Sequence, residues 1–252
     1  MPDTKIAVVT GASRGLGRSM VQHLARAGVG VIGTYHSRRD EADRLLAEID
    51  EIGVPAAFLQ LDVADTSGFP SFAAAVRDTL AGFGVERVDY LVNNAGIGIY
   101  APFAETTEEQ FDELVNIQFK APFFLTQELL PLLADGGRIL NVSSGLARFT
   151  NPGYAAYAAT KGAIEVLTRY QAQELAQRQI RVNVLVPGAI ATDFGGGVVR
   201  DNPQVNDAVA GAVALGRAGV ADDIGAAVPA ILSDAMGWAN GSRIELSGGQ
   251  NL

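Results

Sequence analysis

The sequence of 252 residues contains no cysteine, two histidines and no apolar run that approaches the roughly 20 residues of a membrane span. The absence of cysteine excludes disulfides, thiol catalysis and thiolate metal ligands. His23 and His36 lie far apart without a metal-ligand spacing, so we expect no catalytic or structural metal. The first apolar segment is strand-sized, without a basic region or a cleavage site, which predicts a soluble cytoplasmic protein without a membrane partner.

Positive charge is also scarce in this chain. Lys and Arg number 19 against 28 Asp and Glu, which gives a formal net charge of −9. Nucleic acid affinity depends on the neutralisation of phosphates by Lys and Arg, so no nucleic acid partner is expected. The 48% hydrophobic content is ample for a large core, and we find no linker, repeat or low-complexity stretch. These features predict a single domain over residues 1–252.

Short β-branched runs alternate with helix-length segments along the chain. The runs lie at 5–10, 30–35, 56–61, 88–93, 138–143, 181–187 and 242–246. They are apolar without strict polar alternation, as expected of strands that are buried on both faces. The pattern predicts an α/β fold, a Rossmann-type doubly wound parallel sheet of about seven strands with helices on both faces. A long irregular segment is predicted at roughly 188–215, and such segments are usually functional.

A glycine-rich loop, "TGASRGLG" at 10–17, directly follows the first predicted strand and precedes a helix-like segment. Glycines let the backbone turn tightly and approach a pyrophosphate, and the N-terminus of the following helix supplies free N–H groups. The spacing of Gly11, Gly15 and Gly17 differs from the dinucleotide fingerprint G-x-G-x-x-G. The loop alone therefore leaves an ordinary Gly-rich turn as an alternative.

The end of the second predicted strand bears on the choice of dinucleotide. Tyr35 stands where NAD-selective sites carry an acidic residue. Ser37 and Arg38 offer a hydrogen bond and a positive charge to a 2′-phosphate, and Arg14 can reach in from the glycine-rich loop. This favours NADP over NAD. The alternatives are that Arg38 only begins a solvated helix, or that an acidic residue at 40–41 serves the ribose.

The stretch "YAATK" places Tyr157 and Lys161 four residues apart at the start of a long helix-forming segment. Residues at this spacing share a helix face, with Cβ atoms roughly 5–6 Å apart. A positive charge at that distance would lower the pKa of the phenol towards the working range of a general acid or base. The alternative is a surface tyrosine that packs on a lysine stem.

"TGASRGLG", "NNAG" (93–96) and "YAATK" occur in this order, and with them the sequence resembles the short-chain dehydrogenase/reductase family over essentially its whole length. The resemblance implies four active-site residues. Tyr157 would be the general acid and base, and Ser144 would hydrogen-bond the same carbonyl oxygen. Lys161 would lower the pKa of Tyr157 and bind the nicotinamide ribose. Asn116 would hold a water that resupplies the proton, its alternative being a polar residue at a helix kink.

The resemblance also implies an NADP(H) site. The expected cofactor-binding residues are Gly11, Ser13, Arg14, Gly15, Leu16, Gly17, Tyr35, His36, Ser37, Arg38, Asp62, Val63, Asn93, Ala95, Gly96, Tyr157, Lys161, Pro187, Gly188, Ile190 and Thr192. Among them, Asp62 and Val63 would lie beside the adenine, and Ile190 and Thr192 would hold the nicotinamide carboxamide. Asn93 has the alternative role of linking strands.

The expected activity is reversible, NADP-dependent reduction of a ketone to a secondary alcohol. A nucleotide-sensing scaffold would not need the four active-site residues, and a nucleotide-sugar epimerase usually has a different glycine spacing and an added domain. Reduction of 3-oxoacyl groups on an acyl carrier protein requires a basic docking surface, and sugars or polyols require several polar contacts. The expected substrate edge consists of Leu146, Phe149, Tyr154, Phe194 and Val198. These side chains favour an apolar or aromatic ketone.

Two further expectations concern motion and assembly. The segment 193–216 contains three consecutive glycines followed by two valines, which predicts a substrate lid that is mobile without cofactor. Its alternative is a tight turn before a short fixed helix. The resemblance implies a homotetramer in which the helices that carry Asn116 and Tyr157 lie between subunits. The apolar stretch at 121–133 agrees with such an interface, and also with a deeply buried helix.

Overall fold

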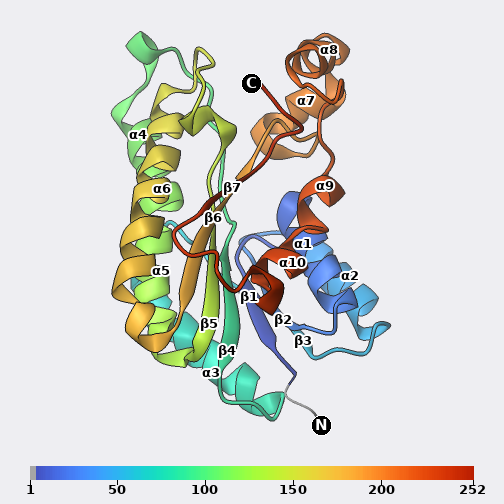
Figure 1. Cartoon of the computed structure of the whole chain (residues 1–252), viewed down its shortest axis with the longest axis vertical. Helices are drawn as coiled ribbons and strands as arrows, with labels where there is room; N and C mark the ends of the chain where they lie inside the picture. Colours follow the sequence, from blue (N-terminus) through green and yellow to red (C-terminus); the bar gives the residue numbers. More distant parts are fainter. Residues whose placement is uncertain (1–3) are drawn as a thin grey trace.

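The computed structural model describes residues 4–252, and residues 1–3, which begin the segment in which no leader is predicted, lie outside it. Within the described residues, seven parallel strands form one sheet in the order β3-β2-β1-β4-β5-β6-β7 (Figure 1). The strands are β1 (Ile6–Val9), β2 (Gly30–Tyr35), β3 (Ala56–Gln60), β4 (Val88–Asn93), β5 (Leu133–Val142), β6 (Arg181–Pro187) and β7 (Arg243–Leu246). The predicted α/β class and doubly wound parallel sheet are confirmed.

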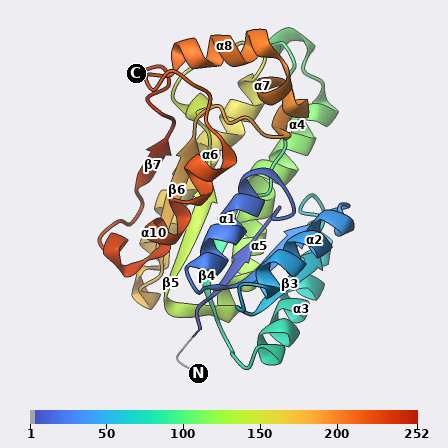
Figure 2. The ribbon, with the colours of Figure 1, turned by 90° about the vertical axis from the view of Figure 1, so that its right-hand side faces the viewer.

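Helices cover both faces of this sheet (Figures 1 and 2). They are α1 (Gly15–Arg26), α2 (Arg39–Asp50), α3 (Phe69–Gly82), α4 (Glu108–Val115), α5 (Ala121–Leu129), α6 (Ala155–Glu174), α7 (Val198–Asp201), α8 (Pro203–Ala212), α9 (Ala221–Gly225) and α10 (Val228–Leu232). The helices α3, α5 and α6 lie on one face, and α1, α2 and α10 lie on the other. In the part of the chain that the structure describes, no helix is both long and apolar enough to cross a membrane.

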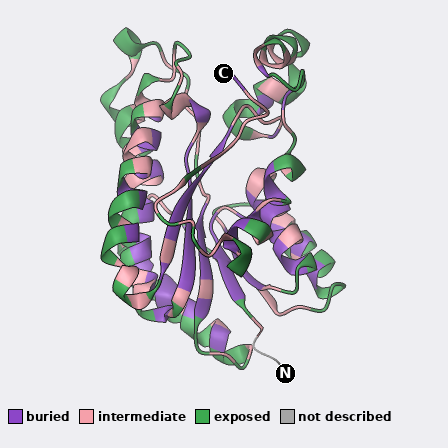
Figure 3. Cartoon of the chain, viewed as in Figure 1, coloured by how far each residue is buried: buried purple, intermediate pink, exposed green. Residues whose placement is uncertain are grey.

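Two apolar layers hold the sheet between these helices. Successive side chains of a strand point to opposite faces. Ile6 and Val8 of β1 accordingly pack with α3 and α5, whereas Ala7 and Val9 pack with α1 and α2. Figure 3 shows inner strands, β2, β1, β4, β5 and β6, that are buried along most of their length beneath helices whose outer surfaces are exposed. Burial on both faces is the reason why these strands are apolar without alternation.

The strand order reverses between β1 and β4, which pair in the middle of the sheet. In a doubly wound sheet, the chain leaves such a pair of strands towards opposite faces, which opens a ligand crevice at their carboxyl ends. Gly11 follows β1 and Ala95 follows β4. A Cβ atom on Gly11 would lie 2.9 Å from the Ala95 Cα, so the two loops meet at the floor of the crevice.

Two segments differ from the sequence prediction. The region 188–215 is not irregular, because it contains α7 and α8 (Figure 2). The Asn202 side chain accepts a hydrogen bond from the Val205 N–H at 3.2 Å, and a proline occupies the first turn of α8, so local capping starts this helix. The strand predicted from 138 begins at Leu133, where it already pairs with β4 before a register shift.

The contact between α1 and α9 is close enough to test. A Cβ atom on Gly225 would lie 2.1 Å from the Ser19 Oγ and 2.6 Å from the Ser19 carbonyl carbon. Gly225→Ala should therefore lower the free energy of unfolding by about 1–3 kcal/mol, as measured by urea denaturation. Gly82→Ala is the matched control, because a Cβ atom there meets nothing within 4 Å. Equal stability of the two variants would contradict the close helix packing.

Candidate active site

A cavity of about 1000 Å³ lies at the carboxyl ends of the strands. Of the predicted cofactor-binding residues, it is lined by Gly11, Ser13, Arg14, Gly15, Leu16, Gly17, Tyr35, His36, Ser37, Arg38, Asp62, Val63, Ala95, Gly96, Tyr157, Lys161, Pro187, Gly188, Ile190 and Thr192. Ser144 lines it too, and so do the five residues of the predicted substrate edge: Leu146, Phe149, Tyr154, Phe194 and Val198. One continuous cavity therefore contains most of both predicted sets.

The glycine-rich loop is shaped for close contact with a ligand backbone. Gly11 has a φ of +63°, and a Cβ atom on Gly17 would lie 2.2 Å from the Gly11 carbonyl oxygen. The Asn94 side chain, which the sequence analysis missed, donates to the Thr10 carbonyl at 2.8 Å and so links this loop to the end of β4. Arg14 precedes α1 without capping it through its side chain. The first N–H groups of α1 can therefore bind a pyrophosphate, so the loop fits a dinucleotide.

The charged side chains around the end of β2 are already paired. Arg38 donates to Glu41 at 2.9 Å, and Asp62 lies 3.7 Å from His36. Arg14 lies 3.8 Å from Asp193 at the other side of the cavity. The last residue of β2 is Tyr35, at the position where NAD-selective sites carry a carboxylate. Glu41, one of the two acidic residues that the sequence left open as a ribose ligand, is thus the partner of Arg38, a predicted phosphate ligand.

Asn93 lies below the cavity and does not line it. Its side chain is 5% exposed and donates to Thr126 at 3.0 Å and to Asn141 at 2.8 Å. Asn141 in turn donates to Thr168 of α6 at 2.9 Å. Asn93 thus connects β4 with α5, β5 and α6, which is the strand-linking role that the sequence left open.

Tyr157 and Ser144 share a hydrogen bond at the inner end of the cavity. Burial raises the pKa of Tyr157 to about 12, and the side-chain hydrogen bond from Ser144 opposes this shift. Tyr157 is 6% exposed, and it stands in the first turns of α6, which begins at Ala155. The phenol therefore keeps its proton at neutral pH.

Lys161 lies one turn further along α6 and is 5% exposed. Its Nζ atom donates to the Val142 carbonyl at 2.9 Å and lies 5.7 Å from the centre of the Tyr157 ring. Burial lowers the pKa of Lys161 to about 7. The expected lowering of the Tyr157 pKa is absent from the free protein, because burial acts on both groups and leaves the ammonium only partly charged at neutral pH.

Asn116 begins a π-helical turn at Asn116–Lys120, where α4 passes into α5. The Ala121 N–H donates to the Asn116 carbonyl across this turn. The cavity is lined by Ile117 of the same turn and by Glu113 of α4, but not by Asn116. π-Helical turns inside helices are rare and frequently occur at functional sites. The structure therefore places Asn116 beside the site, at the kink that was its alternative reading.

Aromatic rings surround the outer half of the cavity next to Tyr157. The ring centres of Phe194 and Tyr154 lie 5.8 Å and 6.3 Å from that of Tyr157. Tyr100, which the sequence analysis did not identify, extends this group, with its ring centre 5.5 Å from that of Tyr154. Phe194 is 44% exposed and leaves aromatic surface open to a ligand. This half of the cavity can bind a planar apolar molecule.

Further lining residues missed by sequence analysis include Gln250 and Asn251, at the carboxyl end of the chain. They follow β7, the last parallel strand, and residues after such strands lie at the ligand edge of the sheet. This rule is the signal by which the sequence could have identified both residues. Within residues 4–252, no group of three or more His, Cys, Asp or Glu side chains is arranged to hold a metal ion.

Known proteins share this architecture. A family model described as enoyl-(acyl carrier protein) reductase matches residues 11–251. The hydroxynaphthalene reductase-like protein Arp2 of Metarhizium brunneum is 32% identical over 256 residues, which cover 97% of this chain and 94% of the relative. The promiscuous reductase LugOII, which catalyzes keto-reduction at C1 during lugdunomycin biosynthesis, is 36% identical with a TM-score of 0.93 over 98% of each chain. The landomycin C-6 ketoreductase LanV, with bound NADP and rabelomycin, is 32% identical with a TM-score of 0.89, over 98% of this chain and 96% of its own.

The burial of Lys161 has a consequence for stability. Its pKa is about 7 in the folded protein against an ordinary 10.5, so between these values the unfolded chain binds more protons. The penalty is complete below the folded pKa and is relieved as pH rises. From about pH 8 to about pH 10, the free energy of unfolding of the parent should rise by about 2–2.5 kcal/mol relative to Lys161→Met.

Urea denaturation of the ligand-free proteins across this range measures the difference. The range ends at about pH 10 because the raised pKa of Tyr157 acts in the opposite sense above its ordinary value of 10.0. Lys120→Met, which removes an exposed lysine, is the control and should run parallel to the parent. If Lys161→Met also runs parallel, the buried ammonium does not carry the shift.

Proposed function

Because the chain belongs to the short-chain dehydrogenase/reductase family of oxidoreductases, as its motifs predicted, we propose that it reduces an apolar, aromatic ketone to a secondary alcohol with NADPH. The observation that carries this proposal is the hydrogen-bonded pair of hydroxyl groups, Ser144 and Tyr157, beside Lys161 in a large cavity. A ketone oxygen placed between two hydroxyl donors is held in position and polarised.

The chemistry divides between the cofactor and this chain's residues. NADPH, when bound, would supply the hydride for the carbonyl carbon. Tyr157 would give its proton to the carbonyl oxygen. Its raised pKa leaves the phenol protonated at neutral pH but a weaker acid, and a charged Lys161 would lower that pKa. Ser144 would donate a second hydrogen bond to the same oxygen. Lys161 would bind the ribose, and an anionic ligand nearby would favour its charged form.

Asn116 would hold the water molecule that resupplies the proton to Tyr157. It lies in the π-helical turn beside the cavity. The direction of reaction is set by cofactor supply, because the same groups can accept the proton from an alcohol.

Two features support NADP as the cofactor. The cavity has Tyr35 and Ser37 instead of an acidic residue at the end of β2, with Arg38 and Arg14 close by. LanV, which shares this fold, was solved with bound NADP. The loop 187–192 would hold the nicotinamide end, since Ile190 and Thr192 both line the cavity next to Tyr157 and Lys161.

The aromatic outer half of the cavity supports the substrate class. The rings of Phe194 and Tyr154 both lie against that of Tyr157, and Leu146 and Phe149 add apolar surface. LugOII and LanV are ketoreductases, and LanV was solved with rabelomycin. The Arp2 relative is described as hydroxynaphthalene reductase-like.

An acyl group on an acidic carrier protein is the second candidate, because the matching family model is described as an enoyl-(acyl carrier protein) reductase. Such a partner needs unpaired positive charge at the cavity mouth. The arginines around the cavity are already engaged: Arg14 and Arg200 with Asp193, Arg38 with Glu41 and Arg148 with Glu245. Because these arginines are already paired with carboxylates, a small ketone is favoured over an acyl group on a carrier protein.

We extend the proposal to a lid and to assembly. Side chains of α7 and α8 line the cavity, so the segment 193–216 would close over the substrate. Its mobility without cofactor stays a prediction. A homotetramer is supported by exposed apolar side chains on the face formed by α4, α5 and α6, namely Phe111, Phe123, Phe124, Val166 and Tyr170.

The role of Tyr157 can be tested by removing one oxygen. Tyr157→Phe should lower turnover by about 10²–10⁴ while NADPH binding, followed by fluorescence titration, is retained. Tyr170→Phe makes the same change at an exposed position of α6 and should leave turnover unchanged. Turnover of Tyr157→Phe within a few-fold of the parent on aromatic ketones would contradict the proposed proton donor.

Cofactor choice can be tested at Arg38, which lines the cavity and forms an ion pair with Glu41. Arg38→Ala should weaken NADPH binding by roughly 1.5–3 kcal/mol and leave NADH nearly unchanged, because only NADPH carries the 2′-phosphate. Arg39→Ala is the matched control, since Arg39 pairs with Asp43 and does not line the cavity. Calorimetric titration with both cofactors measures the change. Equal losses for the two cofactors would mean that Arg38 has a structural role.

A further inference from the structure

The chain ends in a segment, residues 247–252, that folds back over the cavity and is called the C-terminal tail below. The Asn251 N–H donates to the Ala212 carbonyl at 2.9 Å, and the Leu215 N–H donates to the Gly248 carbonyl at 3.1 Å. Val213 also forms an antiparallel bridge with Gln250. The tail is therefore paired with the end of α8, and Gln250 and Asn251 form part of the cavity wall.

The Gln250 side chain makes the contact between this tail and the loop 187–192. It is 7% exposed, and its Oε1 atom accepts a hydrogen bond from the Ala189 N–H at 2.8 Å. The approach is close, because a Cβ atom on Gly188 would lie 2.9 Å from the same Oε1 atom. On the far side of the loop, the Ala191 N–H donates to the Gly219 carbonyl at 2.8 Å. The loop is thus held from two sides, and Gln250 supplies one of them.

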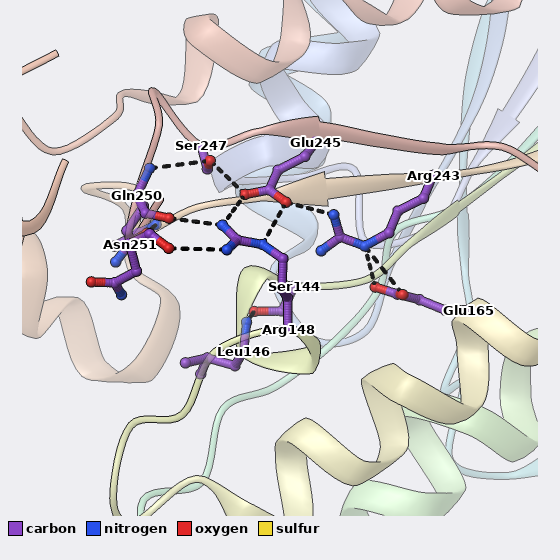
Figure 4. A network of polar contacts seen from close by, with 10 residues as sticks. Ser144, Leu146, Arg148, Glu165, Arg243, Glu245, Ser247, Gln250 and Asn251 are labelled. Carbon is purple, nitrogen blue, oxygen red and sulfur yellow. Dashed lines mark hydrogen bonds and ion pairs between the residues drawn. The ribbon is translucent and has the colours of Figure 1, made fainter. Parts of the chain in front are cut away.

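The tail is itself held by Arg148, which follows Ser144 by one short helical turn (Figure 4). The Arg148 guanidinium donates to the Gln250 carbonyl at 2.8 Å and to the Asn251 carbonyl at 3.0 Å. It also makes a two-point contact with Glu245, at 3.1 Å and 2.8 Å. The hydrogen bond from Arg148 is the largest cause of a Glu245 pKa lowered to about 2, so the carboxylate stays charged across the working range.

Glu245 links Arg148 to further residues of β7 and α6. Arg243 contacts both Glu245 and Glu165, and Glu165 accepts a hydrogen bond from Ser143 at 3.0 Å. The same Ser143 hydroxyl lies 3.1 Å from the Lys161 carbonyl, so its one proton is shared between the two acceptors. The residues on both sides of Ser144 are therefore tied to one network, and Gln250 is its contact with the loop 187–192.

We propose that Gln250 is a positioning residue, which sets the loop 187–192 relative to Ser144 and Tyr157. The inference rests on the proposed function, because that loop is assigned there to the nicotinamide end of the cofactor. A side chain at 250 that lacks an acceptor leaves the Ala189 N–H without its partner. The loop then keeps its backbone hydrogen bonds to Leu246 and Gly219 but loses its side-chain contact with the tail. The tail remains fixed by its backbone contacts, so the change is local.

Two variants separate this role from a general structural one. Gln250→Met keeps the length of the side chain but removes the oxygen acceptor, whereas Gln250→Glu keeps the acceptor. In Gln250→Met, the KM for NADPH should rise by about tenfold and kcat should fall, with the KM for the ketone changed less than twofold, the size of effect expected for one lost hydrogen bond. Gln250→Glu should recover most of both parameters. Hydrogen exchange of the Ala189 amide in the ligand-free proteins should be faster in Gln250→Met alone.

Each outcome decides the matter. Exchange at Ala189 that is unchanged in Gln250→Met would overturn the proposal, and so would faster exchange with an unchanged KM for NADPH and kcat. Equal kinetic losses in Gln250→Met and Gln250→Glu would also overturn it, because the acceptor would then not be the cause. If the parent neither binds nor oxidises NADPH, the proposed function fails. The exchange measurement then still tests the contact, supporting it if Gln250→Met alone is faster.

Discussion

The burial of a phenol and an ammonium at the same end of the sheet is the constraint on which the rest of the site depends. Removal from water stabilises the neutral form of each group, so Tyr157 holds its proton and Lys161 readily gives one up. Neither shift could persist in an exposed site, and the burial requires the packed first turns of α6. The fold therefore sets the acid strength of the pair before any ligand arrives. A phenol that is protonated at neutral pH suits reduction, where the first need is a proton for the carbonyl oxygen.

Such burial needs polar support, and this chain provides it on two levels. Directly at the site, the Val142 carbonyl accepts from Lys161, and Ser144 bonds to Tyr157. Below it, the chain from Asn93 through Asn141 to Thr168 ties α6 to the centre of the sheet. Buried polar groups are costly unless they are paired, so the hydrogen bonds of this network also fix the position of the helix. The site residues stay in place because the groups behind them would lose their partners if α6 moved.

Sequence reasoning succeeded where one local pattern decides the outcome. The apolar strand runs predicted the parallel sheet because burial on both faces leaves no choice of residue type, and the loop 10–17 was recognisable because it follows a strand directly. It failed where distant partners decide. Asn93 adjoins the cofactor loop in sequence, yet Thr126 and Asn141 draw its side chain into the core. Whether the pKa of Tyr157 is raised or lowered depends on how deeply Tyr157 and Lys161 are buried. Their spacing of four residues carries no information about burial. The helices in 188–215 were hidden because three glycines obscure the pattern, although Asn202 and the proline after it form an ordinary helix start.

The paired arginines around the cavity change what selectivity for a 2′-phosphate means in this protein. Arg38 and Arg14 are neutralised by Glu41 and Asp193, so a phosphate would gain only the difference between its own contacts and those it replaces. When a phosphate replaces a carboxylate as the partner of an arginine, binding of the ligand is coupled to release of that carboxylate. Glu41 lies on α2 and can stay beside Arg38, sharing it. Asp193 lies at the entrance to α7, where it also contacts Arg200, so a phosphate that takes Arg14 would loosen the link between the glycine-rich loop and the segment above the cavity. Under the proposed function the two arginines would therefore serve different ends: Arg38 would bind the phosphate, and Arg14 would couple that binding to the segment 193–216 through Asp193.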